Sequence, residues 1–263
     1  MQRYIAFLDI LGFRELIQKT ELSELTRRIG HIIEHAQFAE CLGKIREENG
    51  TAHPDTKYHA VYRFSFSDSF VLASKDDSKD SLNSIIVTTC LLAQGLFVSQ
   101  MPVRGSIVIG EADFIPRTDH MVGKGLIAAV DLKKKQDWFG IMIDPSIGNH
   151  EQLMQLLHPK VAPMVVPYSV PMKDGTLQDA MTINWRLNIT SELGTRSFFP
   201  SPANESAQRK LDNTLAFAKH LRCNRLAYTP ADEPWLRPIY LTRQPVPEPP
   251  FQLVLEESHG DEF

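Results

Sequence analysis

The order in which strand-like and helix-like segments alternate over the first 143 residues constrains the fold more than any other feature of this sequence. Apolar positions that recur every second residue indicate strands, and positions that recur every three or four residues indicate helices. Strands are predicted at residues 3–10, 57–67, 70–74, 103–114 and 139–143, and helices at residues 13–38, 82–100 and 123–136. The resulting order, β-α-β-β-α-β followed by α-β, predicts one antiparallel sheet with helices on one face, which is an α+β fold.

A C-terminal extension is predicted to follow this sheet. Residues 160–190 contain three prolines and a Lys-Asp-Gly turn between strand-like runs, which indicates a hairpin. Residues 206–222 have the apolar spacing of an amphipathic helix, and the Pro-rich, acidic tail from about residue 245 is typical of an extended segment. We therefore expect a ferredoxin- or palm-like domain at residues 1–150 and an extension at residues 151–263 that packs on the same unit.

Two aspartates stand at the ends of apolar, strand-like runs. Asp9 closes the first strand, and Asp68 lies between two serines at the predicted tip of the following hairpin. A charge at the end of an apolar run is costly unless another group compensates it. In the predicted sheet the first strand lies beside the third, so both aspartates reach the same edge. This placement predicts that they share a cation, as in a metal-dependent phosphoryl-transfer site.

The residues around Asp9 suit such chemistry. Mg²⁺ and Mn²⁺ prefer oxygen ligands, commonly one or two carboxylates together with substrate phosphates, and the Ile10 carbonyl would add a further ligand. Gly12 precedes the next helix, where free N–H groups and close backbone approach favour phosphate binding. A simpler interpretation stays open, because an aspartate before a helix is often only an N-cap and one at a hairpin tip is often only a turn residue.

Four motifs in the first 145 residues resemble, in the same order, those of class III nucleotidyl cyclases. The run from Phe7 to Phe13 is similar to their Phe-x-Asp-x-x-Gly-Phe signature. Ser67-Asp68-Ser69 resembles their second metal-binding aspartate, although a glycine usually precedes it. Residues 103–110 resemble the strand with Val-Arg and a later glycine, and residues 123–126 resemble the start of the next helix.

The resemblance implies roles for individual residues. Asp9, Asp68 and the Ile10 carbonyl would bind two Mn²⁺ or Mg²⁺ ions per active site, and Arg104 would contact the substrate or organise the site. The residues implied in substrate binding are Phe7, Gly12, Phe13, Tyr62, Phe64 and Lys124.

Two departures from the family pattern are informative. Purine cyclases read the base with a lysine and a glutamate on the strand before the second aspartate, where this chain has Tyr62 and Phe64. These aromatic side chains would stack on a base or fill the space left by a smaller one, and they are equally compatible with ordinary sheet core. The family's asparagine and arginine on the following helix are replaced by Ile127 and Asp131. Transition-state charge would then need another cation, for which the candidates are Arg104, Lys124, Lys133 and Lys134.

These departures, the chain length and the C-terminal extension are similar to those of the bacterial Pycsar pyrimidine cyclases, a divergent branch of class III. The resemblance implies conversion of UTP to cyclic UMP and pyrophosphate, as an antiphage signal read by a separate effector, in a homodimer with active sites at the interface. Cyclisation of CTP to cyclic CMP is the alternative. Two other classes stay open: a non-catalytic, cyclase-like nucleotide sensor, and another palm-like nucleotidyl transferase, against which the absence of a GG-D/E-E-F motif counts.

Composition narrows the expected partners and cellular context. The 263 residues carry a net charge of −4, which gives no global attraction to nucleic acid or to an acidic membrane surface. The three cysteines are far apart, and the first residues lead directly into a strand without a signal peptide. No apolar stretch reaches the ~20 residues of a membrane helix. We therefore expect a cytoplasmic protein with reduced thiols, and neither nucleic acid nor a membrane as a partner.

Overall fold

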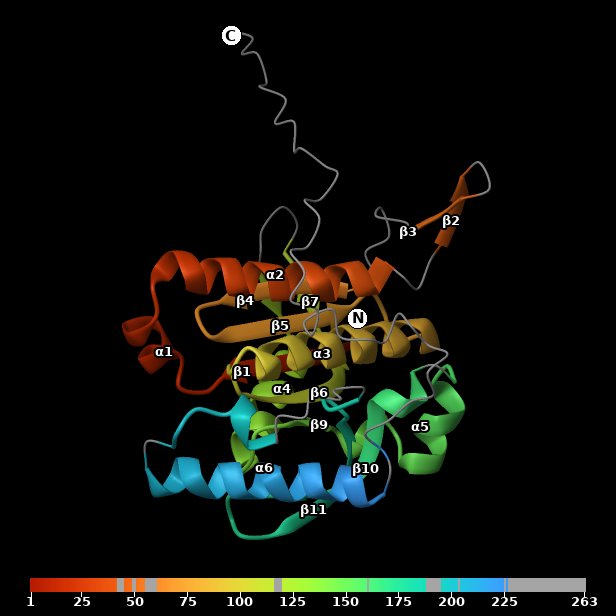
Figure 1. Ribbon diagram of the computed structural model, residues 1–263. Coiled ribbons are helices and arrows are strands. Elements are labelled where there is room, and N and C mark those ends of the chain that lie inside the picture. Colours follow the sequence, from red (N-terminus) through yellow and green to blue (C-terminus); the bar gives the residue numbers. More distant parts are fainter. Residues whose placement is uncertain are drawn as a thin grey trace, which may run out of the picture.

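The computed structural model describes residues 1–41, 45–48, 51–54, 61–115, 120–159, 161–187, 195–202, 204–224 and 226. Its centre is a seven-stranded sheet with the order β10-β11-β9-β6-β1-β5-β4 (Figure 1). The strands of this sheet are β1 (Gln2–Ile10), β4 (Val61–Phe66), β5 (Ser69–Ser74), β6 (Val103–Glu111), β9 (Ile141–Ile143), β10 (Val165–Pro171) and β11 (Leu177–Ile183). The α-helices are α1 (Phe13–Lys19), α2 (Leu22–Cys41), α3 (Lys79–Val98), α4 (Lys124–Lys135), α5 (His150–Leu156) and α6 (Glu205–Cys223).

Strand β1 lies in the interior of the sheet, between β6 and β5, because it is apolar on both faces. Ile5, Ala6 and Leu8 are completely buried. The strand pairs antiparallel with β5 on one side and with β6 on the other, and β4 follows β5 as a hairpin. All neighbouring strands in this sheet are antiparallel except β6 and β9. The α+β, palm-like sheet predicted from the sequence is therefore confirmed.

The two faces of the sheet carry different helices. On one face, Ile33 of α2, Leu92 of α3 and Phe70 of β5 line a common cavity of about 450 Å³. Ile5 points to the opposite face in the β1–β5 register, where an added Cβ at Gly125 of α4 would lie 2.5 Å from the Ile5 side chain. The prediction of helices on one face holds for α2 and α3, whereas α4 lies on the other. Helix α4 connects the parallel strands β6 and β9 and packs on the face that α2 and α3 leave uncovered.

The chain after residue 150 adds strands to the same sheet. Strands β10 and β11 form the predicted hairpin, and β11 pairs with β9. Helix α6 packs at this end of the sheet (Figure 1), where the ring centroids of Phe217 and Trp138 are 5.0 Å apart. The predicted hairpin and helix are thus present, while the division at residue 150 stays a prediction. The tail predicted from about residue 245 lies outside the described residues.

Three local segments differ from expectation. Residues 47–57 are polar and contain a glycine and a proline, which indicates a loop. The structure instead has most of a small hairpin there, β2 (Ile45–Glu48) with β3 (Thr51–Pro54). The strand expected from residue 57 is described from Val61 onward, because residues 57–60 lie outside the described part of the chain. The strand expected at 103–114 is interrupted at Ala112, and its end forms β7 (Asp113–Phe114), which pairs with β8 (Met121–Val122). Short 3₁₀ helices lie at Pro145–Ile147, Ala162–Met164 and Thr195–Phe198.

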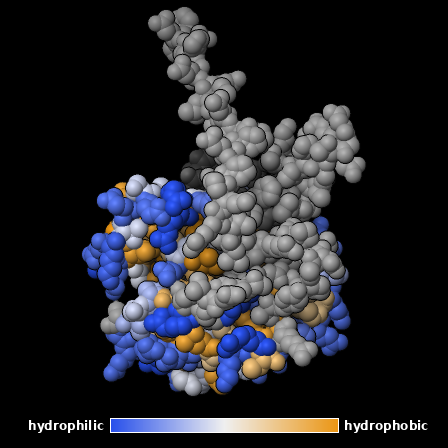
Figure 2. All heavy atoms as spheres, viewed as in Figure 1, coloured by the Kyte–Doolittle hydropathy of each residue, from blue (hydrophilic) through white to orange (hydrophobic). Residues whose placement is uncertain are grey.

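Helix α3 is long and apolar enough to cross a membrane by length and composition alone. Most of the helix is nevertheless buried inside the molecule. Among the residues coloured in Figure 2, hydrophilic ones predominate on the surface in view, with smaller hydrophobic patches between them. The composition of α3 is therefore explained by its place in the core.

Candidate active site

Asp9 is held between two side chains at the end of β1. Its Oδ2 accepts a hydrogen bond from the ammonium group of Lys133 on α4 at 2.8 Å, and its Oδ1 accepts one from Ser69 Oγ at 3.2 Å. The Asp9 and Lys133 side chains are only 17% and 9% exposed. Lys133 Nζ also lies 4.8 Å from the centroid of the Phe7 ring. Because little water reaches this carboxylate, its charge is compensated mainly by the ion pair.

Asp68 lies in the turn between β4 and β5, directly beside the end of β1. Its carbonyl accepts a hydrogen bond from Ile10 N at 2.8 Å, and its neighbour Ser69 pairs with Asp9 in the β1–β5 register. Ser67 has a positive φ of 57°, which closes this two-residue turn. Asp68 is partly exposed, so a ligand can reach it. The structure thus brings the two aspartates together at the same end of the neighbouring strands β1 and β5.

Arg104 faces Asp9 across the β1–β6 pair. It is only 7% exposed, its Nη1 donates a hydrogen bond to the Gln136 carbonyl at 3.1 Å, and its Nε has no hydrogen-bond partner among the described residues. Burial lowers the pKa of Arg104, and the carboxylates of Asp9 and Asp137 oppose that shift. The buried guanidinium therefore places a positive charge opposite Asp9.

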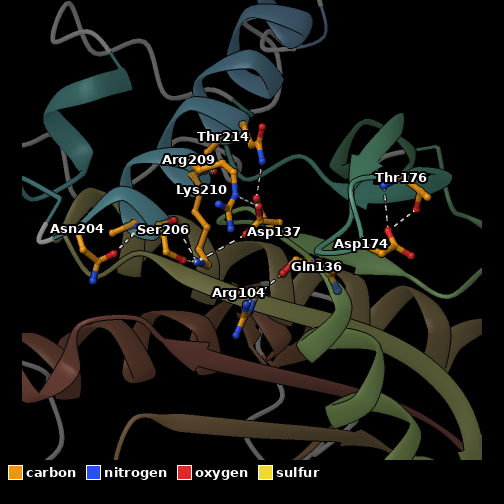
Figure 3. A network of polar contacts seen from close by, with 12 residues as sticks. Arg104, Gln136, Asp137, Asp174, Thr176, Asn204, Ser206, Arg209, Lys210 and Thr214 are labelled. Atoms are coloured by element: carbon orange, nitrogen blue, oxygen red, sulfur yellow. Dashed lines mark hydrogen bonds and ion pairs between the residues drawn. The ribbon is translucent and has the colours of Figure 1, made fainter.

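A polar network connects the surroundings of Arg104 to helix α6 (Figure 3). Asp137 accepts a hydrogen bond from Arg209 Nε at 2.5 Å and lies 3.6 Å from Lys210 Nζ. The hydrogen bond with Asp137 raises the pKa of Arg209. Asn213 adds a hydrogen bond to the Asp137 carbonyl at 2.7 Å. The C-terminal helix is therefore fixed to the segment that supports Arg104.

Tyr62 and Phe64 form an aromatic cluster with Phe114 of β7. The ring centroids of Tyr62 and Phe114 are 4.3 Å apart, and those of Phe64 and Phe114 are 5.6 Å apart. The Arg3 guanidinium carbon lies 4.5 Å from the centroid of the Phe114 ring. The β-sheet register puts Tyr62 and Phe64 on the face that carries Asp9. Tyr62 is 42% exposed, so this ring keeps a free surface beside Phe114.

The other residues predicted for substrate binding lie in two places. Gly12 has a positive φ of 77° and Phe13 begins α1 directly after it. An added Cβ at Gly12 would meet nothing within 4 Å, so the space beside it is open. Lys124 is the first residue of α4, whereas Lys133 is in its last turn. The structure therefore brings Lys133 to Asp9 and leaves Lys124 at the other end of the helix.

The oxygen atoms at this edge fit a hard divalent cation. Asp9 and Asp68 carry carboxylates. Ile10, which follows Asp9 and whose N–H donates to the Asp68 carbonyl, carries a backbone carbonyl. Mg²⁺ and Mn²⁺ prefer such oxygen donors and take their remaining ligands from water or substrate phosphates. In the part of the chain that the structure describes, no three His, Cys, Asp or Glu side chains converge on a common point. The donor set therefore suits a cation that shares its coordination with a nucleotide.

Sequence reasoning missed two residues beside Asp9. The sequence shows Ser69 only as the serine after Asp68, whereas in the structure its hydroxyl donates a hydrogen bond to Asp9 Oδ1. Phe66 is 85% exposed and lies opposite Ser69 in the β4–β5 register, which makes it the aromatic residue of β4 nearest to the Asp9 row. Lys133 was one of several candidate cations, because a run of three lysines does not reveal which one is buried.

Comparisons with known proteins concern the fold. No family model and no curated protein matches the sequence. Among solved structures, the chain is similar to a bacterial light-regulated adenylyl cyclase, with 11% identity over 70% of this chain and 90% of that chain and a TM-score of 0.41. It is also similar to adenylate cyclases from Trypanosoma brucei, with 11% identity over 70% and 88% of the chains and a TM-score of 0.44. The adenylyl cyclase CyaB from P. aeruginosa matches with 14% identity over 69% and 93% of the chains and a TM-score of 0.40.

Proposed function

We propose that this protein is a cytosolic nucleotide cyclase that converts UTP to cyclic UMP and pyrophosphate. The observation that carries the proposal is the meeting of Asp9 and Asp68 at one sheet edge, with the hydrogen bond from Ile10 N to the Asp68 carbonyl at 2.8 Å. The motif resemblance of residues 3–145 supports the reaction class. The same resemblance supports a role of the product as an antiphage signal that a separate effector reads.

The reaction is an intramolecular phosphoryl transfer. The ribose 3′-hydroxyl oxygen forms a bond with the α-phosphorus, the bond from the α-phosphorus to the oxygen that bridges to the β-phosphorus breaks, and pyrophosphate leaves with that oxygen. The hydroxyl proton passes to solvent water. Asp9, Asp68 and the Ile10 carbonyl would hold divalent cations, which activate the hydroxyl and neutralise the leaving pyrophosphate. The chain's own work is to align the nucleotide and stabilise charge.

Gly12 and Arg104 contribute to this alignment and charge stabilisation in different ways. The open backbone at Gly12 leaves space for the polyphosphate beside the metal ligands. The buried Arg104 guanidinium, opposite Asp9 in the β1–β6 register, contributes positive charge that offsets the charge of the phosphates. Because β1, β5 and β6 are consecutive in the sheet, these groups approach the substrate from a rigid support.

The pyrimidine preference rests on Tyr62 and Phe64. Neither side chain can form the charged contacts that a lysine and a glutamate make to a purine edge. Phe114 stacks on Phe64 and packs at a tilt against Tyr62, so it occupies part of the space on this face. A smaller base fits this arrangement better than a larger one. Uracil is proposed as the base, and cytosine is the alternative because it has the same size.

A homodimer with active sites at the interface is part of the proposal. Three exposed apolar side chains lie on the side of the sheet that carries Asp9: Phe66 is 85% exposed, Ile127 is 63% exposed and Tyr62 is 42% exposed. Exposed apolar groups on one side are typical of an association surface. The family's asparagine–arginine positions, Ile127 and Asp131, also lie on the exposed part of α4, where they would face a partner.

A non-catalytic nucleotide sensor is the second candidate. The observation that favours it is the replacement of the asparagine–arginine pair by Ile127 and Asp131, which removes two groups that bear transition-state charge in the family. Such a protein would bind a nucleotide with Asp9, Asp68 and Arg104 and release it unchanged.

One experiment separates these functions. The purified protein is incubated with Mn²⁺ and each of the four ribonucleoside triphosphates, and pyrophosphate and nucleotide products are measured by chromatography. We expect cyclic UMP from UTP, and cyclic CMP from CTP would identify the alternative base. Binding of a nucleotide without release of pyrophosphate would identify a sensor and refute the cyclase. Products from ATP or GTP alone would refute the pyrimidine preference.

A further inference from the structure

We propose that Lys133 controls the access of a divalent cation to Asp9. The Lys133 ammonium group is bonded to the Asp9 carboxylate, and it moves to the polyphosphate when a nucleotide binds. This inference rests on the proposed function in one respect, which is that Asp9 is a metal ligand. It assigns Lys133 a positioning role. The sequence around Lys133 does not distinguish it from Lys134 and Lys135.

Both oxygen atoms of Asp9 already have partners. Lys133 Nζ is 2.8 Å from Oδ2, and Ser69 Oγ is 3.2 Å from Oδ1. A hydroxyl can share an oxygen with a metal ion, but an ammonium group and a divalent cation on the same carboxylate repel each other. The repulsion is strong here because the two side chains are only 17% and 9% exposed. This repulsion favours displacement of Lys133 when a metal ion binds to Asp9.

The position of Lys133 is determined by the fold. Its ammonium group packs on the Phe7 ring at 4.8 Å from the centroid. Helix α4 is held against the sheet by close backbone contact, since an added Cβ at Gly110 would lie 2.6 Å from Gly125 Cα. Lys134 and Lys135 are exposed, whereas Lys133 is buried. Of the three consecutive lysines, Lys133 alone has its ammonium group on Asp9.

The charge balance at this edge favours entry of metal together with nucleotide. Two carboxylates, Asp9 and Asp68, are accompanied by two cations, Lys133 and the buried Arg104. A cation site normally has an excess of negative charge, which these four groups do not provide. A polyphosphate brings that charge and offers oxygen acceptors to Lys133. The arrangement would keep metal affinity low until substrate is present.

The test measures binding of Mn²⁺ alone, with no nucleotide, by electron paramagnetic resonance of the free ion. Lys133→Met and Lys133→Gln remove the ammonium group, and both are used because the lysine stem is buried. Lys135→Met is the matched control on the same helix turn. We expect Mn²⁺ affinity to rise about tenfold or more in both Lys133 variants, since a charged hydrogen bond is lost. The affinity should stay unchanged in Lys135→Met, and Asp9→Asn combined with Lys133→Met should abolish the gain.

The outcomes are distinguishable from those of the cyclase assay. An unchanged or lower Mn²⁺ affinity in both Lys133 variants overturns the proposal, as does a gain that persists with Asp9→Asn. A higher affinity without any nucleotide product from the wild-type protein supports the role of Lys133 and refutes the cyclase. Product formation with unchanged Mn²⁺ affinity in the variants supports the cyclase and refutes the role of Lys133.

Discussion

At the scale of single residues, the candidate site combines groups that the sequence reveals with groups that it conceals. Asp9 and Asp68 are recognisable because a carboxylate at the end of an apolar strand needs compensation. Lys133 is concealed, because its neighbours in the chain are identical lysines and only the orientation of α4 selects it. The sequence therefore predicts where charge is needed, and the tertiary contacts decide which side chain supplies it.

Removing either carboxylate tests the metal site directly. Asp9→Asn and Asp68→Asn should lower cyclisation of UTP by roughly a hundredfold or more, because a neutral amide is a poor ligand for a hard cation. Both variants should keep their secondary structure, as measured by circular dichroism, since both positions lie at the ends of strands. Asp77→Asn, at an exposed aspartate away from this edge, is the control. Full activity in either variant would remove the argument for metal at this position.

At the scale of elements, periodicity was sufficient for most strands and helices but not for their faces. The apolar patterns of β1, β5 and β6 predicted strands, and the structure confirms these strands and buries most of their residues. Whether α4 packs on the face of α2 and α3 or on the other face depends on which face remains open, a long-range property. Two glycines, Gly110 and Gly125, allow α4 to approach closely enough for Lys133 to reach Asp9.

Crowding these glycines should displace the helix. An added Cβ at Gly110 would lie 2.6 Å from Gly125 Cα, a backbone atom that cannot rotate away. We expect Gly110→Ala to lower the free energy of unfolding by roughly 1–3 kcal/mol, as for other overpacked cores. Gly30→Ala on α2 is the matched comparison, because its Cβ would meet nothing within 4 Å, and it should be neutral or stabilising by up to about 1 kcal/mol. Urea denaturation measures both, and equal effects would contradict the packing argument.

The start of α3 provides a pH-dependent prediction. Asp76 accepts hydrogen bonds from Ser78 N at 3.0 Å and from Ser81 Oγ at 2.6 Å. Hydrogen bonds from Ser78 and Ser81 lower the pKa of Asp76 from 3.8 to about 2. A depressed pKa in the folded state stabilises the protein above the ordinary value, and this contribution disappears as the pH falls from about 4 to about 2.

Asp76→Asn should therefore destabilise the protein at neutral pH and have little effect near pH 2. We expect a loss of about 1 kcal/mol or less at pH 7, because the carboxylate is solvent-screened. Denaturation of the wild type and the variant at a series of pH values measures this difference, and Asp77→Asn is the neighbouring control. A difference that stays constant between pH 7 and pH 2 would show that the carboxylate charge is not involved.

At the scale of the whole molecule, the C-terminal extension and the first domain share one sheet. Strand β11 pairs with β9, and Asp137 binds α6 through Arg209 and Lys210. The ion pairs of α6 thus lie one residue from Gln136, whose carbonyl receives the Arg104 hydrogen bond. Substitutions in the extension can therefore reach the site through contacts that no local motif would indicate.

Association of two copies is the prediction that belongs to this scale. Ile127 is 63% exposed on α4, so Ile127→Glu should leave the free energy of unfolding of the single chain nearly unchanged. In a homodimer with sites at the interface, the same change should raise the dissociation constant about tenfold or more and lower activity at low protein concentration. Sedimentation across a concentration series measures the dissociation constant of the dimer. A fully active wild-type monomer would refute the shared site.

The sequence by itself determined the order of elements, the burial of the first strand and the two aspartates at the end of strand-like runs, because burial periodicity and isolated charge are local properties. Only the tertiary structure decided that α4 covers the Asp9 face, that Phe114 packs against Tyr62 and Phe64, and that Lys133 holds the Asp9 carboxylate. Those contacts join residues far apart in the chain. They depend on which surfaces remain open once the sheet has formed, and that is a property of packing rather than of any sequence window.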